Sequence, residues 1–176
     1  MPVRAGQPEH KSALASNLEG NVLDLSEDKY GCRVIQKALD VCDHDTQARL
    51  VNDLMGHVMQ CVKDQNGNHV IQKCIEKVPA HLIHFIVEAF QGQIFHLSVH
   101  PYGCRVIQRL LEHCLDNQRG PILKEVMLHV EELCKDQYGN YVVQHVLVHG
   151  TSWHRQQIVL VIKGRVLNLS EHKYAR

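Results

Sequence analysis

The sequence predicts an all-α protein, a right-handed α-solenoid of three-helix repeats that are 36 residues long. Three observations support this fold class: an internal repeat of fixed period, apolar residues at helical spacing, and no alternating pattern long enough for useful strands. A single unit of this size cannot bury its own apolar face, whereas stacked units share a continuous core. The 176 residues accommodate four complete units and the start of a fifth.

The repeat is visible in four aligned segments, each with glycine at its second position and glutamine at its seventh. Successive glycines lie 36 residues apart, as from Gly31 to Gly67, and no insertion interrupts the register. The segments are YGCRVIQKAL from Tyr30, NGNHVIQKCI from Asn66, YGCRVIQRLL from Tyr102 and YGNYVVQHVL from Tyr138. We expect a leader or the end of a preceding repeat at 1–19, repeats at about 20–55, 56–91, 92–127 and 128–163, and a truncated fifth repeat at 164–176.

The first repeat illustrates the expected order of elements. A short first helix covers about residues 21–27, a second about 31–41 and a third about 46–54, with turns near Asp28 and at Gly56. The third helices carry an aliphatic stripe that recurs in each repeat. The stripe consists of Leu50, Ile86, Ile122 and Ile158, followed by Leu54, Phe90, Val126 and Ile162.

Later repeats carry turn-forming residues at matching places. Pro79 and Gly150-Thr151 mark the turn between the second and third helices. Pro121 is expected in the first turn of a third helix, where its missing N–H does little harm. The glycines of the aligned segments are expected to let the second helix start close to its neighbour. The residues before them are expected to serve the helix start or packing between repeats: Tyr30, Asn66, Tyr102 and Tyr138.

The composition excludes several classes of protein. Lys and Arg number 19 and Asp and Glu number 19, so the formal net charge is zero and a uniformly basic phosphate-binding arm is ruled out. No apolar run approaches the roughly 18 residues that span a bilayer, and residues 1–20 contain no apolar signal core. We therefore expect neither a membrane protein nor a secreted one.

The seven cysteines and 14 histidines do not indicate a metal site. Seven is odd and no Cys-x-x-Cys pair occurs, so we expect reduced thiols in the cytosol or nucleus. The nearest approach to ligand spacing is His113-Cys114 or His81-x-x-His84, and neither has a matching second half. No metal or other cofactor is expected. Five cysteines lie on apolar stripes and are expected in the core: Cys42, Cys61, Cys74, Cys114 and Cys134.

The second helix has an apolar half and a polar half. On a wheel with about 100° per residue, positions 32, 33 and 36 point to one side and positions 34, 35, 38 and 39 to the other. The polar triplets alternate between two types but keep Gln in third place, which a purely structural surface has no reason to do. For Cys32 and Cys104 this side favours a functional role. The triplets are Cys32/Arg33/Gln36, Asn68/His69/Gln72, Cys104/Arg105/Gln108 and Asn140/Tyr141/Gln144.

These side chains suit unpaired nucleobases. Asn with Gln offers donors and acceptors for the mixed edge of uracil, whereas Cys with Gln leaves one amide and a small apolar contact, which suits adenine. The middle residues have flat faces on which bases can stack, as rungs of a ladder: Arg33, His69, Arg105 and Tyr141. A row of basic residues follows and could contact phosphates: Lys37, Lys73 and Arg109, with His145 last.

The period, the three-helix units and the YGCRVIQ and NGNHVIQ segments resemble the Pumilio (PUF) family of RNA-binding proteins, over about residues 20–174. In that family each repeat reads one base with two or three side chains of its second helix. The resemblance implies a crescent with single-stranded RNA antiparallel on its concave side. It implies adenine contacts by Cys32/Gln36 and Cys104/Gln108 and uracil contacts by Asn68/Gln72 and Asn140/Gln144, which together read 5′-UAUA-3′.

The resemblance also implies binding to messenger RNA 3′ untranslated regions and post-transcriptional repression in the cytoplasm, with co-repressors or deadenylation factors on the convex face. We expect no enzyme and no small-molecule substrate, because Asp64 and Asp136 lie in different repeats and look structural. The family usually has eight repeats. In the family, the repeat that corresponds to the fifth one here ordinarily reads guanine through Ser-Asn-x-x-Glu, but Arg176 stands at the Ser position. Two interpretations therefore remain open: the chain is an excised segment, or it is a shortened paralogue with weak RNA binding. A helical scaffold that binds protein is the rival function.

Overall fold

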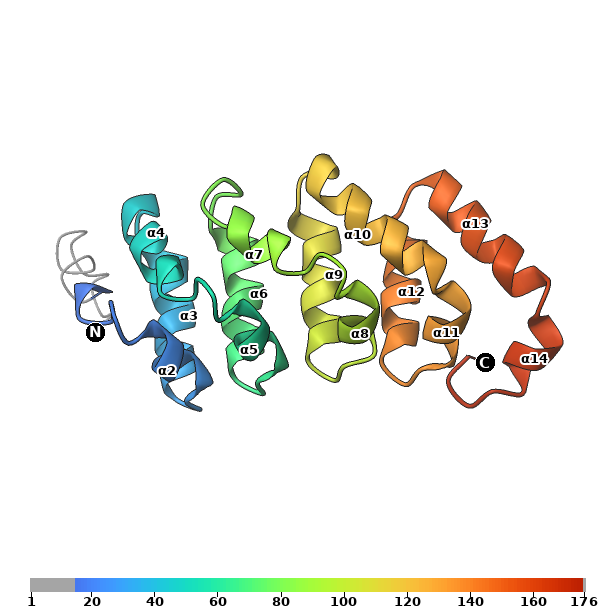
Figure 1. Cartoon of the computed structure of the whole chain (residues 1–176), viewed down its shortest axis with the longest axis horizontal. Helices are drawn as coiled ribbons and strands as arrows, with labels where there is room; N and C mark the ends of the chain where they lie inside the picture. Colours follow the sequence, from blue (N-terminus) through green and yellow to red (C-terminus); the bar gives the residue numbers. More distant parts are fainter. Residues whose placement is uncertain (1–14, 176) are drawn as a thin grey trace, which may run out of the picture. The chain divides into compact units, whose positions relative to one another are not determined.

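The computed structural model describes residues 15–175, which form helices and turns without a strand (Figure 1). The all-α class is therefore confirmed for this part of the chain. Residues 1–14, which make up most of the expected leader segment, and Arg176 lie outside the described residues. None of the helices in residues 15–175 is long and apolar enough to cross a membrane.

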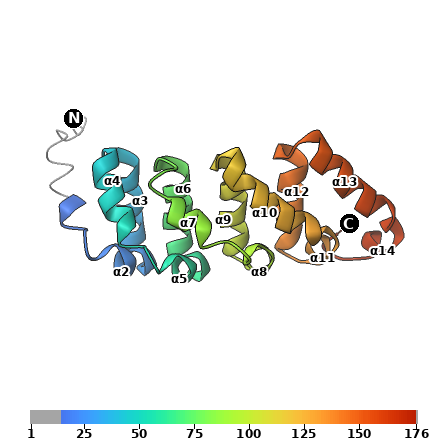
Figure 2. The ribbon, with the colours of Figure 1, turned by 45° about the horizontal axis from the view of Figure 1, so that its top comes forward.

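The chain divides into two compact units between residues 86 and 87, and α7 (His84–Glu88) contains this division. The helices of the first unit are α2 (Val22–Glu27), α3 (Gly31–Val41), α4 (His44–Asn52), α5 (Val58–Lys63) and α6 (Gly67–Lys77). Those of the second are α8 (Ile94–Ser98), α9 (Gly103–His113), α10 (Asp116–Leu128), α11 (Val130–Lys135), α12 (Gly139–His149), α13 (Ser152–Lys163) and α14 (Val166–Ser170). Within each unit the second helices of neighbouring repeats lie side by side, α3 with α6 and α9 with α12 (Figure 2).

Each second helix starts against the first helix of its own repeat. The bounds of α3 coincide with the expected range 31–41. A Cβ atom on Gly31 would lie 2.6 Å from the carbonyl oxygen of Leu25, and one on Gly103 would lie 2.7 Å from that of Leu97. These distances are shorter than any side chain tolerates, so glycine is required for the close approach that the sequence predicted.

A side chain three residues before each of these glycines fixes the start of the second helix. The Oδ1 atom of Asp28 accepts hydrogen bonds from the backbone N–H groups of Tyr30 and Gly31, at 2.9 and 2.6 Å. These bonds, the one from Gly31 above all, hold the pKa of Asp28 below its usual value. Asp64 and Asp136 make the same pair of contacts, and His100 makes them through Nδ1. The two carboxylates that recur in the sequence, Asp64 and Asp136, therefore have a structural role in the turn before the helix.

The third helices vary more than the sequence predicts. Val78, which precedes Pro79, is extended with φ −90° and ψ 136°, as proline requires, and α7 is only five residues long. Helix α10 begins at Asp116, so Pro121 lies in its interior and the expectation of a first-turn proline is wrong. The same helix continues through Leu128, which occupies the place where Gly20, Gly56 and Gly92 have positive φ.

The core is aliphatic and follows the predicted stripe. Seven of the eight stripe residues are buried, and Ile162 is half-buried. Of the cysteines expected in the core, Cys61, Cys74, Cys114 and Cys134 are buried and Cys42 is half-buried. Burial raises the pKa of the Cys61 thiol to about 12. Burial also raises the pKa of Cys74, Cys114 and Cys134, so the four buried thiols are protonated packing groups at neutral pH.

Candidate nucleic-acid interface

The middle residues of the triplets are accessible. Arg33, His69 and Arg105 are exposed, and Tyr141 has an exposed fraction of 46%. In the second unit, the guanidinium carbon of Arg105 lies 5.6 Å from the ring centroid of Tyr141. Two consecutive rungs of the predicted ladder thus point to the same side and touch each other through a cation–π contact.

The Asn-type repeats contain a closed network of amide hydrogen bonds. Nδ2 of Asn140 donates to the carbonyl oxygens of Asp136 and Gln137, at 2.9 and 3.1 Å. Nε2 of Gln144 donates to Oδ1 of Asn140 at 2.8 Å. Because the amide nitrogen of Gln144 is directed at Asn140, its Oε1 is directed away from it. Asn68 and Gln72 repeat the whole pattern, with 2.9 Å between Gln72 Nε2 and Asn68 Oδ1.

The Cys-type repeats lack this network. The Nε2 atoms of Gln36 and Gln108 are buried and have no hydrogen-bond partner. The reason is visible in the sequence, because a thiol stands where the other repeats have the Oδ1 acceptor, four residues earlier. A buried donor without a partner costs about 1–3 kcal/mol. Such unsatisfied groups are uncommon in proteins and often mark a place where a ligand or water completes the structure.

The position of Cys32 and Cys104 on the polar half does not expose them. Their exposed fractions are 2% and 1%. Each Sγ folds back onto the turn that precedes the helix, 3.4 Å from the carbonyl oxygen of Lys29 and 3.5 Å from that of Pro101. Desolvation raises the pKa of Cys104. A base at these repeats can approach the thiols only at their edge, so their role as base contacts stays a prediction.

The predicted row of phosphate contacts contains acids as well as bases. Nζ of Lys73 lies 3.3 Å from Asp40 and 3.5 Å from Glu76. Arg109 forms an ion pair with Glu112, and that glutamate also accepts a hydrogen bond from a ring nitrogen of the next residue in the row, His145. The spacing of Lys73 to Glu76 and of Arg109 to Glu112 is i to i+3, so these partners were visible in the sequence. Lys37 is exposed.

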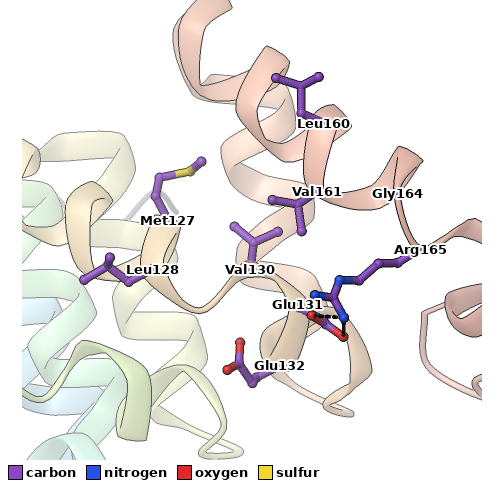
Figure 3. Close-up of a pocket in the computed structure, with 9 residues that line it drawn as sticks. All are labelled: Met127, Leu128, Val130, Glu131, Glu132, Leu160, Val161, Gly164 and Arg165. Carbon is purple, nitrogen blue, oxygen red and sulfur yellow. Dashed lines mark hydrogen bonds and ion pairs between the residues drawn. The ribbon is translucent and has the colours of Figure 1, made fainter.

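A separate pocket of about 610 Å³ lies in the second unit, between α10, α11 and α13 (Figure 3). Its walls include the exposed side chains of Leu128 and Leu160, with exposed fractions of 70% and 62%. Arg165, in the turn before α14, closes one end through a 2.9 Å ion pair with Glu131. This pocket was not predicted from the sequence. Its one signal was leucine at position 128, where the other repeats have glycine.

Comparison with known proteins identifies the repeat. The model of the Pumilio-family RNA binding repeat matches residues 21–55, 57–89, 93–127 and 129–163. Pumilio homolog 1 of Xenopus laevis is 57% identical over 42 residues, which are 24% of this chain and 4% of the frog protein.

Two solved structures that are similar to this chain are RNA complexes. The Puf3 RNA-binding domain bound to a Cox17 RNA 3′ UTR recognition sequence has a TM-score of 0.91 and 43% identity, and the match covers 97% of this chain and 50% of that chain. PUF-8 in complex with PBE-RNA has a TM-score of 0.91 and 38% identity, with coverage of 96% and 50%. This chain thus spans about half the length of these proteins. Because the matched repeats make up most of the sequence, the chain belongs to the Pumilio family of RNA-binding repeat proteins.

Proposed function

We propose that this chain binds single-stranded RNA in a sequence-specific manner, with one base for each of its four repeats. The observation that carries the proposal is the alternation in the glutamine amides. Gln72 and Gln144 are oriented by an asparagine, and Gln36 and Gln108 have a buried nitrogen without a partner. A repeating surface that alternates in this way has the character of a code, as in proteins that read one base per helical repeat.

The Asn-type repeats fit uracil. Oε1 of Gln144 is directed away from Asn140 and can accept a hydrogen bond, while one Nε2 hydrogen remains for donation. The Watson–Crick edge of uracil has N3–H between two carbonyl oxygens, so it supplies both the donor and an acceptor. Adenine carries no hydrogen on N1, and its lone pair would face the Oε1 lone pairs. The fixed amide therefore favours uracil over adenine.

The Cys-type repeats fit adenine. Because nothing holds the nitrogen of Gln108 inward, its amide can turn and donate to adenine N1 while Oε1 accepts from the N6 amino group. After this turn the nitrogen donates to the base, so it is no longer without a hydrogen-bond partner. With the RNA antiparallel to the protein, the order Asn140, Cys104, Asn68, Cys32 gives the preferred core 5′-UAUA-3′.

Stacking requires a local movement. A base between two flat side chains needs about 7 Å, twice the optimal contact distance of about 3.5 Å between carbon atoms. Arg105 and Tyr141 are 5.6 Å apart, so Arg105 must move off the tyrosine ring as a base enters. Stacking contributes roughly 1–3 kcal/mol per base. Four bases would give about 4–12 kcal/mol before the cost of ordering the strand, so we expect weak to moderate affinity.

By its family, we further propose that the chain acts on messenger RNA 3′ untranslated regions and represses their translation. The Puf3 RNA-binding domain is bound to recognition sequences from the Cox17 RNA 3′ UTR in its solved structures, which supports this direction. Recruitment of co-repressors or deadenylation factors belongs to the same proposal.

Titration of a fluorescent RNA that contains UAUA tests the proposed interface. We compare the wild-type chain with Arg105→Ala and Tyr141→Ala, and use Arg155→Ala and Trp153→Ala on α13 as controls that remove the same kinds of side chain elsewhere. Loss of one stacking partner should weaken binding by about 1–3 kcal/mol, or roughly 5- to 150-fold, whereas the controls should bind like the wild type. Unchanged binding in the first two variants would overturn the proposal.

Protein binding is the second candidate function, and the pocket beside α13 favours it. Its exposed leucines, Leu128 and Leu160, lie beside the carboxylate of Glu132 and the Glu131–Arg165 ion pair, which suits an apolar peptide with a basic residue. A chain that binds such a partner as a scaffold would keep that binding when Arg105 or Tyr141 is replaced.

A further inference from the structure

A cluster of ionisable side chains joins α9 and α12 close to the glutamines of the triplets. Glu112 lies four residues after Gln108, and His145 directly follows Gln144. Glu112 on α9 and His145 and His149 on α12 each place one potential ligand atom within 4.8 Å of the others. The two histidines are four residues apart on one helix, so they project from the same face. Glu112 reaches them from the preceding repeat of the same compact unit.

His145 is the inner member of the cluster. Its side chain has an exposed fraction of 9%, and its Nε2 atom lies 2.8 Å from Oε1 of Glu112. Its other ring nitrogen, Nδ1, is buried and has no hydrogen-bond partner. Because Nδ1 is enclosed, Nε2 is the ring nitrogen of His145 that can reach an ion beside Glu112.

His149 is the outer member and is free to adjust. It is exposed, and its ring stacks on that of His145 with 4.4 Å between centroids and 29° between planes. Because this ring is exposed, it can turn about its side-chain bonds and present a nitrogen to a ligand beside His145.

Glu112 supplies the negative charge. Although burial opposes it, hydrogen bonds from His145 and Arg109 hold the pKa of this carboxyl below its usual value. Arg109 pairs with Oε2, whereas His145 contacts Oε1. The oxygen that contacts His145 is therefore not the one that pairs with Arg109, which also lies 3.6 Å from Nε2 of His113.

We propose that Glu112, His145 and His149 bind a divalent transition-metal ion, with Zn²⁺ as the best match. Two imidazole nitrogens and one carboxylate oxygen are a known ligand set for zinc, with water in the fourth position. The ion would replace the proton that Glu112 and His145 share. Nitrogen donors favour zinc, copper or nickel over magnesium and calcium, which prefer oxygen.

The ion requires side-chain movement within the cluster. At zinc–ligand distances of about 2.1 Å, ligand atoms of a tetrahedral site lie about 3.4 Å apart. The 2.8 Å contact between Glu112 and His145 must therefore open slightly. The ring of His149 must rotate out of its stack on His145 so that one nitrogen points at the ion, and its exposure allows this movement. A bound ion would tie the second helices of two successive repeats together. Spacing along the sequence does not reveal this site, because its ligands come from different repeats rather than from one short motif.

Titration of the full chain with zinc, followed by calorimetry, tests the proposal. His149→Ala removes an exposed ligand that packs only at the surface, so the fold should survive. His96→Ala removes an exposed histidine of α8 in the same unit and is the matched control. The wild type and the control should bind one ion, and His149→Ala should bind it at least tenfold more weakly. Zinc should raise the melting temperature of the first two proteins by roughly 5 °C at about 100 times the dissociation constant, and not that of the third.

Cobalt titration identifies the ligands. A site of nitrogen and oxygen ligands gives visible d–d bands without the charge-transfer bands of a thiolate. The thiol of Cys114, two residues from Glu112, belongs to a buried residue, so this cysteine is not expected to compete. Glu112→Gln keeps the shape of the side chain and removes its charge, so it should also lower the affinity for the ion at least tenfold. Thiolate bands, equal affinity in His149→Ala and wild type, or no zinc binding by the wild type would each overturn the proposal.

Discussion

Replacing Cys104 by asparagine turns a Cys-type repeat into an Asn-type repeat with a single substitution. Gln144 donates to Asn140 at 2.8 Å, while the equivalent nitrogen of Gln108 has no partner. An asparagine at position 104 places an Oδ1 acceptor four residues before Gln108, so the glutamine should take the orientation of Gln144. The new hydrogen bond pairs a donor whose isolation costs about 1–3 kcal/mol, so we expect no large loss of stability.

The consequence for RNA is a change of preference at the second base of the core. A matched pair of hydrogen bonds to a base edge discriminates by about 1–3 kcal/mol, or roughly 5- to 150-fold. The wild type should bind UAUA more tightly than UUUA by a factor in this range, and Cys104→Asn should reverse the order.

Fluorescence anisotropy with the two RNAs measures this preference, and circular dichroism shows whether each variant is folded. Cys104→Ala is the matched control, because it removes the thiol without adding an acceptor and should still prefer adenine. A folded Cys104→Asn variant that keeps the preference for adenine would refute the role of asparagine in orienting the glutamine. A shift to uracil in Cys104→Ala would refute it as well.

Three further predictions concern specificity, salt and packing. Asn140→Ser with Gln144→Glu should move the preference at the first base from uracil towards guanine, measured by competition among RNAs that differ only there; retention of uracil would contradict the assignment of this repeat. The logarithm of the binding constant should fall with the logarithm of salt concentration at a slope shallower than about −2, the value for three neutralised phosphates. Asp40→Asn removes an ion-pair partner of Lys73 and should make this slope steeper. An unchanged slope in the variant would argue against a phosphate contact by Lys73. Val106→Ala, at a fully buried position, should lower the free energy of unfolding by about 2 kcal/mol in urea titrations. Val34→Ala, at the equivalent position of the first repeat with 51% exposure, should change it by less than about 0.5 kcal/mol. Equal effects of the two substitutions would contradict the packing.

Sequence periodicity predicts the second helices well because two constraints coincide there. Gly31 must be glycine to approach Leu25, and Asp28 caps the turn before it, so the helix start is fixed by local chemistry that recurs every 36 residues. The third helices have no cap that recurs in every repeat, although Asp43 caps α4 and Thr151 caps α13. Their lengths differ between repeats: α7 has five residues, and α10 starts early enough to place Pro121 in its interior.

The site shows the same division between local and long-range effects. A helical wheel predicts that Arg105 and Tyr141 point outward, and both are exposed. It cannot show that the thiol of Cys104 folds back onto the carbonyl oxygen of Pro101, because that depends on the shape of the preceding turn. Ion pairs between repeats, such as the one that joins Lys73 to Asp40, depend on how the helices stack and not on their spacing in the sequence.

If four second helices each select one base of an RNA strand, one competition experiment shows it most directly. The wild-type chain is bound to a labelled strand with UAUA between cytidines and is challenged with unlabelled UAUA or AAUU in the same flanks. The second strand has the same composition but mismatches the first and fourth bases. Its binding free energy should be about 2–6 kcal/mol less favourable, so its affinity as a competitor should be at least roughly 30-fold lower. Equal competition by the two strands would contradict the account.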